Sequence, residues 1–121
     1  MKKTVILFSL IITIVACNTT DSSDNTTTTP VTKEDPEVVK GLDLVAKSDC
    51  FSCHKVADKL SGPAYTAVAA KYPSNEESIN YLAQKIQKGG SGVWGTIPML
   101  QHPDISTEDA KLMAKYILSV R

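Results

Sequence analysis

The chain has no excess of either charge, few aromatic residues and no apolar run long enough to cross a membrane. Its 121 residues carry 13 Lys and Arg against 13 Asp and Glu, and aromatic residues make up 6%. The balanced charge argues against a nucleic-acid partner and against an acidic solvating tail. A chain of this length holds one folded domain.

The first 16 residues predict an export signal. Lys2 and Lys3 precede a nearly all-apolar stretch, residues 4–15, which is shorter than the roughly 20 residues of a transmembrane helix. Residues 14–17 read Ile-Val-Ala-Cys and resemble the lipobox of bacterial lipoproteins, which would make Cys17 the lipidated first residue of the mature chain. The alternative is an ordinary signal peptide with an incidental cysteine. We expect a lipid-anchored protein on the periplasmic side of a bacterial membrane.

Residues 17–35 predict a lipidated cysteine followed by a flexible polar tether. The stretch is rich in Thr, Ser, Asn and Asp, with Val31 as its single large apolar residue. It cannot bury enough apolar surface to offset its ordering entropy. Its root-mean-square reach is about 25 Å, which would let a small domain swing between membrane-bound partners. A simple spacer is the alternative.

The other two cysteines lie in Cys50-Phe51-Ser52-Cys53-His54. Two thiols separated by two residues, with an imidazole directly after them, suit covalent attachment of haem c. Each sulfur adds to one vinyl group, and His54 then serves as an axial iron ligand. A thioredoxin-like pair would need a βαβ context, which the sequence lacks. Cys17, Cys50 and Cys53 are thus all assigned, and none remains for a disulfide.

Residues 36–121 predict an all-α domain. Asp35 is placed to cap the first helix, Ser74-Asn75-Glu76-Glu77 reads as a capping box, and Ser106 is placed to cap the last helix. Between Gly89 and Pro103 no period holds, so we expect a structured loop there. The predicted helices are residues 36–47, 64–71, a segment from the capping box to Gly89, and 107–120. A core of roughly 85 residues is marginal, so we expect the haem-free domain to be largely unfolded.

Several motifs in this region together resemble the class I monohaem c-type cytochromes, specifically the short bacterial electron-carrier type. The likeness covers residues 36–121. The resemblance implies a small cytochrome c fold, with about four helices wrapped around one covalently bound haem. Its motifs are Pro36-Glu37-Val38-Val39, Cys50-Phe51-Ser52-Cys53-His54, Gly62-Pro63-Ala64-Tyr65, residues 68–72 (Val-Ala-Ala-Lys-Tyr) and residues 92–99 (Gly-Val-Trp-Gly-Thr-Ile-Pro-Met).

The resemblance also implies the iron ligands. His54 would be the proximal ligand, with its second ring nitrogen bound to the carbonyl of Pro63. Met99, after Pro98 in a loop rich in glycine and proline, would be the sixth ligand. Met113 has the spacing of a core residue within the last helix. His102 is either a rival ligand or an exposed loop histidine, and the polar loop with Pro103 favours the second.

Two further residues are expected at the haem. Trp94 is the only tryptophan, and in the family its indole N–H reaches a haem propionate; core packing is the alternative. Lys85 stands where relatives often carry arginine, so it would contact a propionate as a point charge or else lie on a solvated helix face. The family also implies that Gly41 and Val45 cross the last helix near Leu112 and Tyr116.

These features predict a membrane-tethered one-electron carrier, not an enzyme. With both axial positions filled, the iron passes electrons and binds no substrate. We expect a monomer that docks weakly and briefly with redox proteins, an electron donor and a terminal reductase or oxidase. The docking patch implied by family geometry is Phe51, Ala64, Ile97 and Leu100. The alternative is a haem enzyme or gas-binding sensor with a displaceable sixth ligand.

Overall fold

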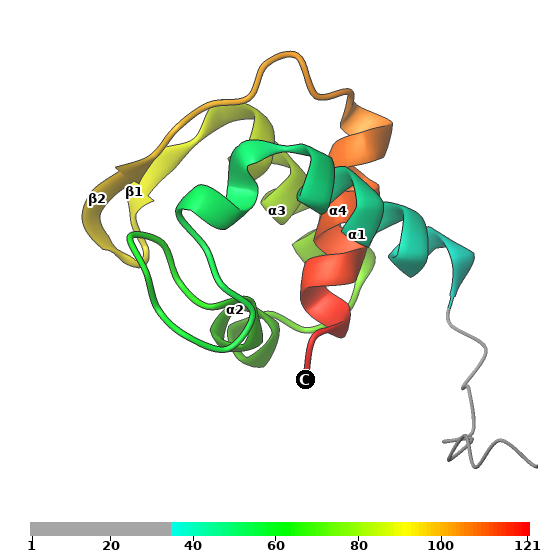
Figure 1. Ribbon diagram of the computed structural model, residues 1–121, viewed down its shortest axis with the longest axis horizontal. Coiled ribbons are helices and arrows are strands. Elements are labelled where there is room, and N and C mark those ends of the chain that lie inside the picture. The colour runs from blue at the N-terminus through cyan, green and yellow to red at the C-terminus, as the bar shows by residue number, and fades with distance from the viewer. Residues whose placement is uncertain (1–34) are drawn as a thin grey trace, which may run out of the picture. The chain divides into compact units, whose positions relative to one another are not determined.

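Four α-helices and one short hairpin account for the regular structure of residues 35–121, the part of the chain that the computed structural model describes (Figure 1). The predictions for residues 1–34, including the export signal, Cys17 and most of the tether, lie outside it. The elements are α1 (Pro36–Lys47), the 3₁₀ turn η1 (Asp49–Ser52), α2 (Tyr65–Lys71), α3 (Glu76–Lys88), β1 (Gly90–Gly92), β2 (Gly95–Met99) and α4 (Thr107–Ser119). The predicted helical fold is confirmed. Between residues 35 and 121, no helix is long and apolar enough to span a bilayer.

The helix starts follow the capping residues, with one correction. The Asp35 side chain accepts a hydrogen bond from the Glu37 backbone N–H at 2.9 Å, and Pro36 occupies the first helical position. Ser106 accepts from the Asp109 N–H at 3.1 Å. The cap of α3 is Asn75 and not Ser74, because the Asn75 side chain accepts from the Ser78 N–H at 2.9 Å. The predicted capping box is therefore wrong by one residue.

The segment predicted as a loop contains a small antiparallel hairpin. Gly90 pairs with Met99 and Gly92 with Gly95. Gly90, Gly92 and Gly95 all have φ near +110°, a conformation that other residues rarely adopt. Three glycines in this position explain why no alternation of polar and apolar side chains marked the strands. The hairpin places Met99 at the end of β2.

The first and last helices cross at a glycine, as predicted. A Cβ atom on Gly41 would overlap the backbone of Leu112 and lie 2.9 Å from the Cβ of Tyr116. Val45, one turn further along α1, is fully buried. The absence of a side chain at Gly41 therefore sets how closely α1 approaches α4.

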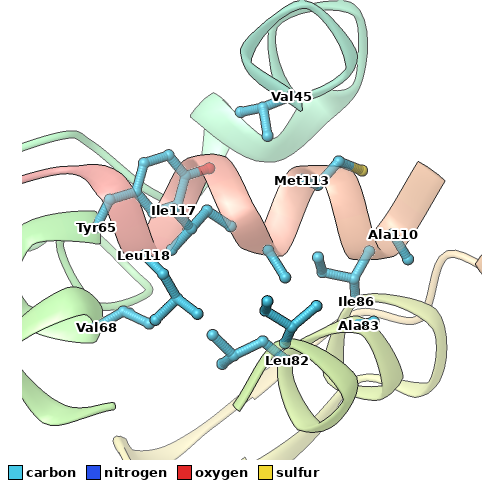
Figure 2. Packing of buried hydrophobic residues seen from close by; sticks show 12 residues of the cluster. Val45, Tyr65, Val68, Leu82, Ala83, Ile86, Ala110, Met113, Ile117 and Leu118 are labelled. Atoms are coloured by element: carbon cyan, nitrogen blue, oxygen red, sulfur yellow. The ribbon is translucent and has the colours of Figure 1, made fainter. Parts of the chain in front are cut away.

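Helix α4 lies at the centre of the packed core. Figure 2 shows Val45 of α1 on one side of α4, and Leu82 and Ile86 of α3 on the other. Met113 is 1% exposed, which confirms its predicted place in the core. The remaining buried side chains of the cluster are Tyr65, Val68, Ile79, Ala83, Ala110, Ala114, Ile117 and Leu118.

Candidate haem-binding site

One cleft of the described domain collects almost all of the predicted site residues. It is lined by side chains from η1, the loop before α2, helices α2 to α4 and the hairpin. The predicted residues on its lining are Cys50, Cys53, His54, Pro63, Lys85, Trp94 and Met99. Residues up to 49 positions apart in sequence thus share one concave, mainly apolar surface.

The attachment segment is a tight turn that continues from α1. After Ser48 caps α1, η1 begins, and the N–H groups of Cys53 and His54 both donate to the Cys50 carbonyl, at 3.2 and 3.0 Å. Cys50 is half-buried and Cys53 is exposed, and neither forms a disulfide within the described residues. Burial, and then the neighbouring Asp49 carboxylate, raise the pKa of the Cys50 thiol. The turn brings both sulfurs and the His54 ring to the same cleft.

His54 is held from three directions. Its Nδ1 lies 2.8 Å from the Pro63 carbonyl oxygen, the contact that the sequence predicted. Because a carbonyl only accepts, Nδ1–H is the donor and Nε2 keeps its lone pair for a metal. The ring also stacks on Tyr65, with centroids 5.4 Å apart and planes 18° apart. A Cβ atom on Gly62 would overlap the imidazole, so only glycine leaves room for the ring in this position.

Met99 lies half-buried at the end of the hairpin and packs against the core cluster. Helix α3 ends at Gly89, whose φ of 66° turns the chain into β1. A Cβ atom on Gly89 would overlap the Met99 carbonyl and lie 3.0 Å from the Leu100 carbonyl carbon. Gly89 therefore lets the segment that follows Met99 pack directly on the end of α3.

Trp94 and Lys85 both line the cleft. Trp94 is 40% exposed, so it is not an ordinary core residue, and the Lys71 ammonium lies 5.7 Å from its ring centroid. Lys85 is half-buried, with its ammonium 5.5 Å from the Tyr81 ring centroid. Lys85 is thus not on a fully solvated helix face. The Lys85 ammonium and the Trp94 indole N–H lie on one cleft and could receive the carboxylates of a cofactor.

His102 is not the exposed loop histidine that the sequence favoured. Its side chain is 22% exposed. Its Nε2 lies 2.9 Å from the Asp49 carboxylate, and its Nδ1 lies 3.2 Å from the Ile86 carbonyl oxygen. Asp49 and His102 are 53 residues apart in sequence, so no spacing signal could have paired them.

The predicted docking patch is wrong at one residue, Ala64. Phe51, Ile97 and Leu100 are exposed by 40%, 64% and 69%, whereas Ala64 is only 6% exposed. Ala64 immediately precedes α2, and its burial there removes it from the surface. Three apolar side chains remain for contact with a partner.

The residues of the cleft fit a haem. Large apolar side chains on its lining remain open to solvent although they belong to an otherwise packed domain, namely Val93, Trp94, Ile97 and Leu100. Such a concentration of exposed apolar surface marks a binding site. His54 presents a nitrogen, Met99 a thioether and the two cysteines their sulfur atoms on that same surface. This donor set is the one that a covalently attached haem with a nitrogen and a sulfur ligand requires.

Comparisons with known proteins agree with this reading of the cleft. A family model described as cytochrome c matches residues 38–121. Cytochrome c-552 of Nitrosomonas europaea is 46% identical over 79 residues, which cover 65% of this chain and 77% of that protein. Cytochrome c-551 of Pseudomonas aeruginosa is 42% identical over 86 residues, which cover 71% of this chain and 77% of that protein. The crystal structure of wild-type Nitrosomonas europaea cytochrome c552 matches with a TM-score of 0.62 at 45% identity, over 66% of this chain and 99% of that one.

Proposed function

The chain belongs to the cytochrome c family, and from this premise we propose that Cys50, Cys53, His54 and Met99 hold its haem in a carrier tethered to a membrane. As a member of this family, the protein is a monohaem electron carrier with one covalently bound haem c, and its relatives are carriers and not enzymes. What remains to be assigned is the role of each residue, the anchoring and the partners.

The observation that carries the residue assignment is the shared cleft of Cys50, Cys53, His54 and Met99. When bound, the haem supplies a one-electron iron couple. The two thiols would hold it as thioethers, and His54 would offer Nε2 because Pro63 already occupies Nδ1. Met99 would offer a soft sulfur, which favours ferrous iron and raises the reduction potential relative to a second histidine. With His54 and Met99 both bound to it, the iron would have no position left for a substrate.

Trp94 and Lys85 are proposed to receive the propionates. Both lie on the cleft lining, and each has a donor that no carboxylate of residues 35–121 takes up. Lys85 would act as a point charge, because it lacks the paired donors of an arginine. The apolar side chains of Val93 and Ile97 would exclude water from the same edge.

The assignment of Met99 is tested by optical spectra of the ferric holoprotein. We expect a methionine-to-iron charge-transfer band in the wild-type protein and in Met113→Leu, and its loss in Met99→Ala and Met99→Leu. Met113 is the matched control because it is the other methionine of the domain and is buried in the core. Absence of the band from the wild-type protein would rule out a methionine ligand and favour His102. Loss of the band in Met113→Leu and not in the Met99 variants would move the ligand to Met113.

The same protein samples separate a carrier from an enzyme or gas sensor. If Met99 binds the iron, the wild-type protein should bind cyanide slowly in the ferric form and carbon monoxide slowly after reduction. Met99→Ala should bind both readily. Ready binding by the wild-type protein would favour a displaceable ligand. The relatives do not favour that alternative, since they are electron carriers.

Anchoring and location rest on the sequence before the domain. We propose a signal peptide over residues 1–16, a lipid on Cys17 and a polar tether to residue 35, which place the domain on the periplasmic side of a bacterial membrane. Labelled palmitate should enter the wild-type protein and not Cys17→Ser. The variant should also move from the membrane fraction to the soluble fraction. A Cys17→Ser protein that stays with the membrane would contradict the anchor.

The proposed partners are redox proteins that dock weakly with a monomer. Phe51 in η1, Ile97 in β2 and Leu100 directly after β2 are exposed apolar residues that a partner could contact. Transient redox encounters use small interfaces, and three such side chains suit one.

A further inference from the structure

We propose that His102 is a positioning residue, whose imidazole ties the segment after Met99 to the turn that carries Cys50. The inference rests on the proposed ligation by Met99. His102 itself does not bind the iron in this arrangement. It would control how firmly the methionine is held at the cleft.

The segment from Met99 to Ile105 is anchored along one side by the end of α3. The His102 backbone N–H lies 3.2 Å from the Ile86 carbonyl oxygen and 3.1 Å from that of Gln87. The Gln87 side-chain amide donates to the Ile105 carbonyl at 2.9 Å. These bonds hold the segment to α3, but none of them reaches the haem-attachment turn.

The His102 ring makes that connection. Its Nε2 lies 2.9 Å from Asp49, the residue immediately before Cys50. Of the hydrogen bonds within residues 35–121, this is the only one that joins residues 48–64, which carry the cysteines and His54, to residues 99–105. Both His102 and Asp49 line the cleft. The pair therefore fixes the spacing between the two segments that carry the proposed iron ligands.

The ring is suited to this task because both of its nitrogens face acceptors. Nδ1 lies 3.2 Å from the Ile86 carbonyl oxygen, and Nε2 faces the Asp49 carboxylate. With hydrogen on Nε2, the ring donates to Asp49. His102 thus joins η1 through its ring and α3 through its backbone N–H. The Asp49 side chain is 67% exposed, so solvent screens the bond and the expected effect is modest.

The test measures how fast added imidazole displaces the methionine from the ferric holoprotein. His102→Ala and Asp49→Ala should each accelerate displacement by about threefold. The double variant should be no faster than either single variant, because both remove the same bond. Both single variants should keep the methionine-to-iron band, since Met99 remains present.

Glu37→Ala is the matched control, because it removes a 2.6 Å ion pair with Lys115 between α1 and α4 that does not line the cleft. Its displacement rate should stay at the wild-type value.

Reduction potentials separate positioning from charge. If the pair acted only through the charge of the Asp49 carboxylate, Asp49→Ala would raise the potential and leave the displacement rate unchanged. That outcome would overturn the inference and leave Met99 as ligand. An unchanged displacement rate in His102→Ala would do the same, and so would effects on the rate that multiply in the double variant. A wild-type protein without the methionine-to-iron band would overturn the Met99 assignment, and this inference with it.

Discussion

Tyr65 links the proposed proximal ligand to the core. Its ring is 2% exposed, stacks on His54 and makes an edge contact with Tyr116 at 6.1 Å. Burial of the phenol is the largest cause of the raised pKa of Tyr65. A tyrosine that resists ionisation in the folded state makes stability depend on alkaline pH.

We therefore predict that Tyr65→Phe flattens the alkaline limb of the stability curve. Above the ordinary tyrosine pKa of about 10, the unfolded chain loses the proton while folded Tyr65 keeps it. The folded state then binds more protons, so the free energy of unfolding falls as pH rises, by at most about 1.4 kcal/mol per pH unit for one tyrosine. Below that pKa the tyrosine does not make the free energy of unfolding depend on pH. The stability curves of the variant and the wild-type protein should therefore run parallel there.

Denaturant unfolding of the holoprotein at pH values on either side of 10 measures this effect. Tyr116→Phe is the control, because Tyr116 is only half-buried, although burial raises its pKa as well. It should flatten the limb less than Tyr65→Phe. Equal alkaline slopes in the wild-type protein and Tyr65→Phe would show that Tyr65 is not the group responsible.

Contacts between residues close in sequence were predicted correctly, whereas a contact between distant residues was not predicted. The attachment turn lies within five consecutive residues, so its motif marks it. The contact between His54 and Pro63, nine residues on, was implied by the family resemblance, and the structure contains it. The bond between Asp49 and His102 joins distant segments, and nothing in the sequence near either residue predicts it. A polar loop followed by proline predicted exposure for His102, but tertiary packing decided otherwise.

At the scale of elements, the crossing of α1 and α4 depends on Gly41. We predict that Gly41→Ala lowers the free energy of unfolding of the holoprotein by up to about 2 kcal/mol. Alanine gains about 1 kcal/mol in helix propensity. Overpacking against the Leu112 backbone and the Tyr116 Cβ costs about 1–3 kcal/mol, and backbone atoms cannot swing aside. The steric cost therefore exceeds the gain.

Denaturant titration gives the difference, and Ala46→Gly calibrates the propensity term. Ala46 lies on the same helix and is exposed, so its replacement changes propensity without touching α4. Suppose that Gly41→Ala raised the free energy of unfolding by as much as Ala46→Gly lowers it. The propensity term would then act alone, and α1 and α4 would not be packed closely enough to exclude a Cβ atom at position 41.

Helices were easier to predict than the hairpin because their signals are longer. Periodic apolar residues and a capping side chain marked α1, α3 and α4, and the one error, Ser74 in place of Asn75, is a choice between adjacent residues that can both cap. β1 is Gly-Ser-Gly, which has no apolar side chain to alternate, and β2 contains a proline. Their pairing is set by glycine conformations and by the packing of Met99.

At the scale of the whole molecule, the packed core continues into the wall of the cleft. The residues that belong to both are Tyr65, Val68, Leu82, Ile86, Met113 and Ile117. On the same lining, Val93, Trp94, Ile97 and Leu100 are between 40% and 69% exposed. A domain of about 85 residues has a small free energy of unfolding. Apolar surface that the cleft exposes to water therefore lowers its stability by a large fraction.

We therefore predict that the domain without haem lacks a cooperative thermal transition. A Cys50→Ala/Cys53→Ala variant cannot attach the cofactor and should show low helix content by circular dichroism, while the wild-type holoprotein melts cooperatively. Adding free haem to the variant is the control: His54 and Met99 remain, so helix content should rise, which separates loss of haem from damage caused by the substitutions themselves. A cooperative transition in the haem-free variant would mean that the helices around α4 are stable alone. The cleft would then be a preformed receptacle, and the haem would not be the second half of the core.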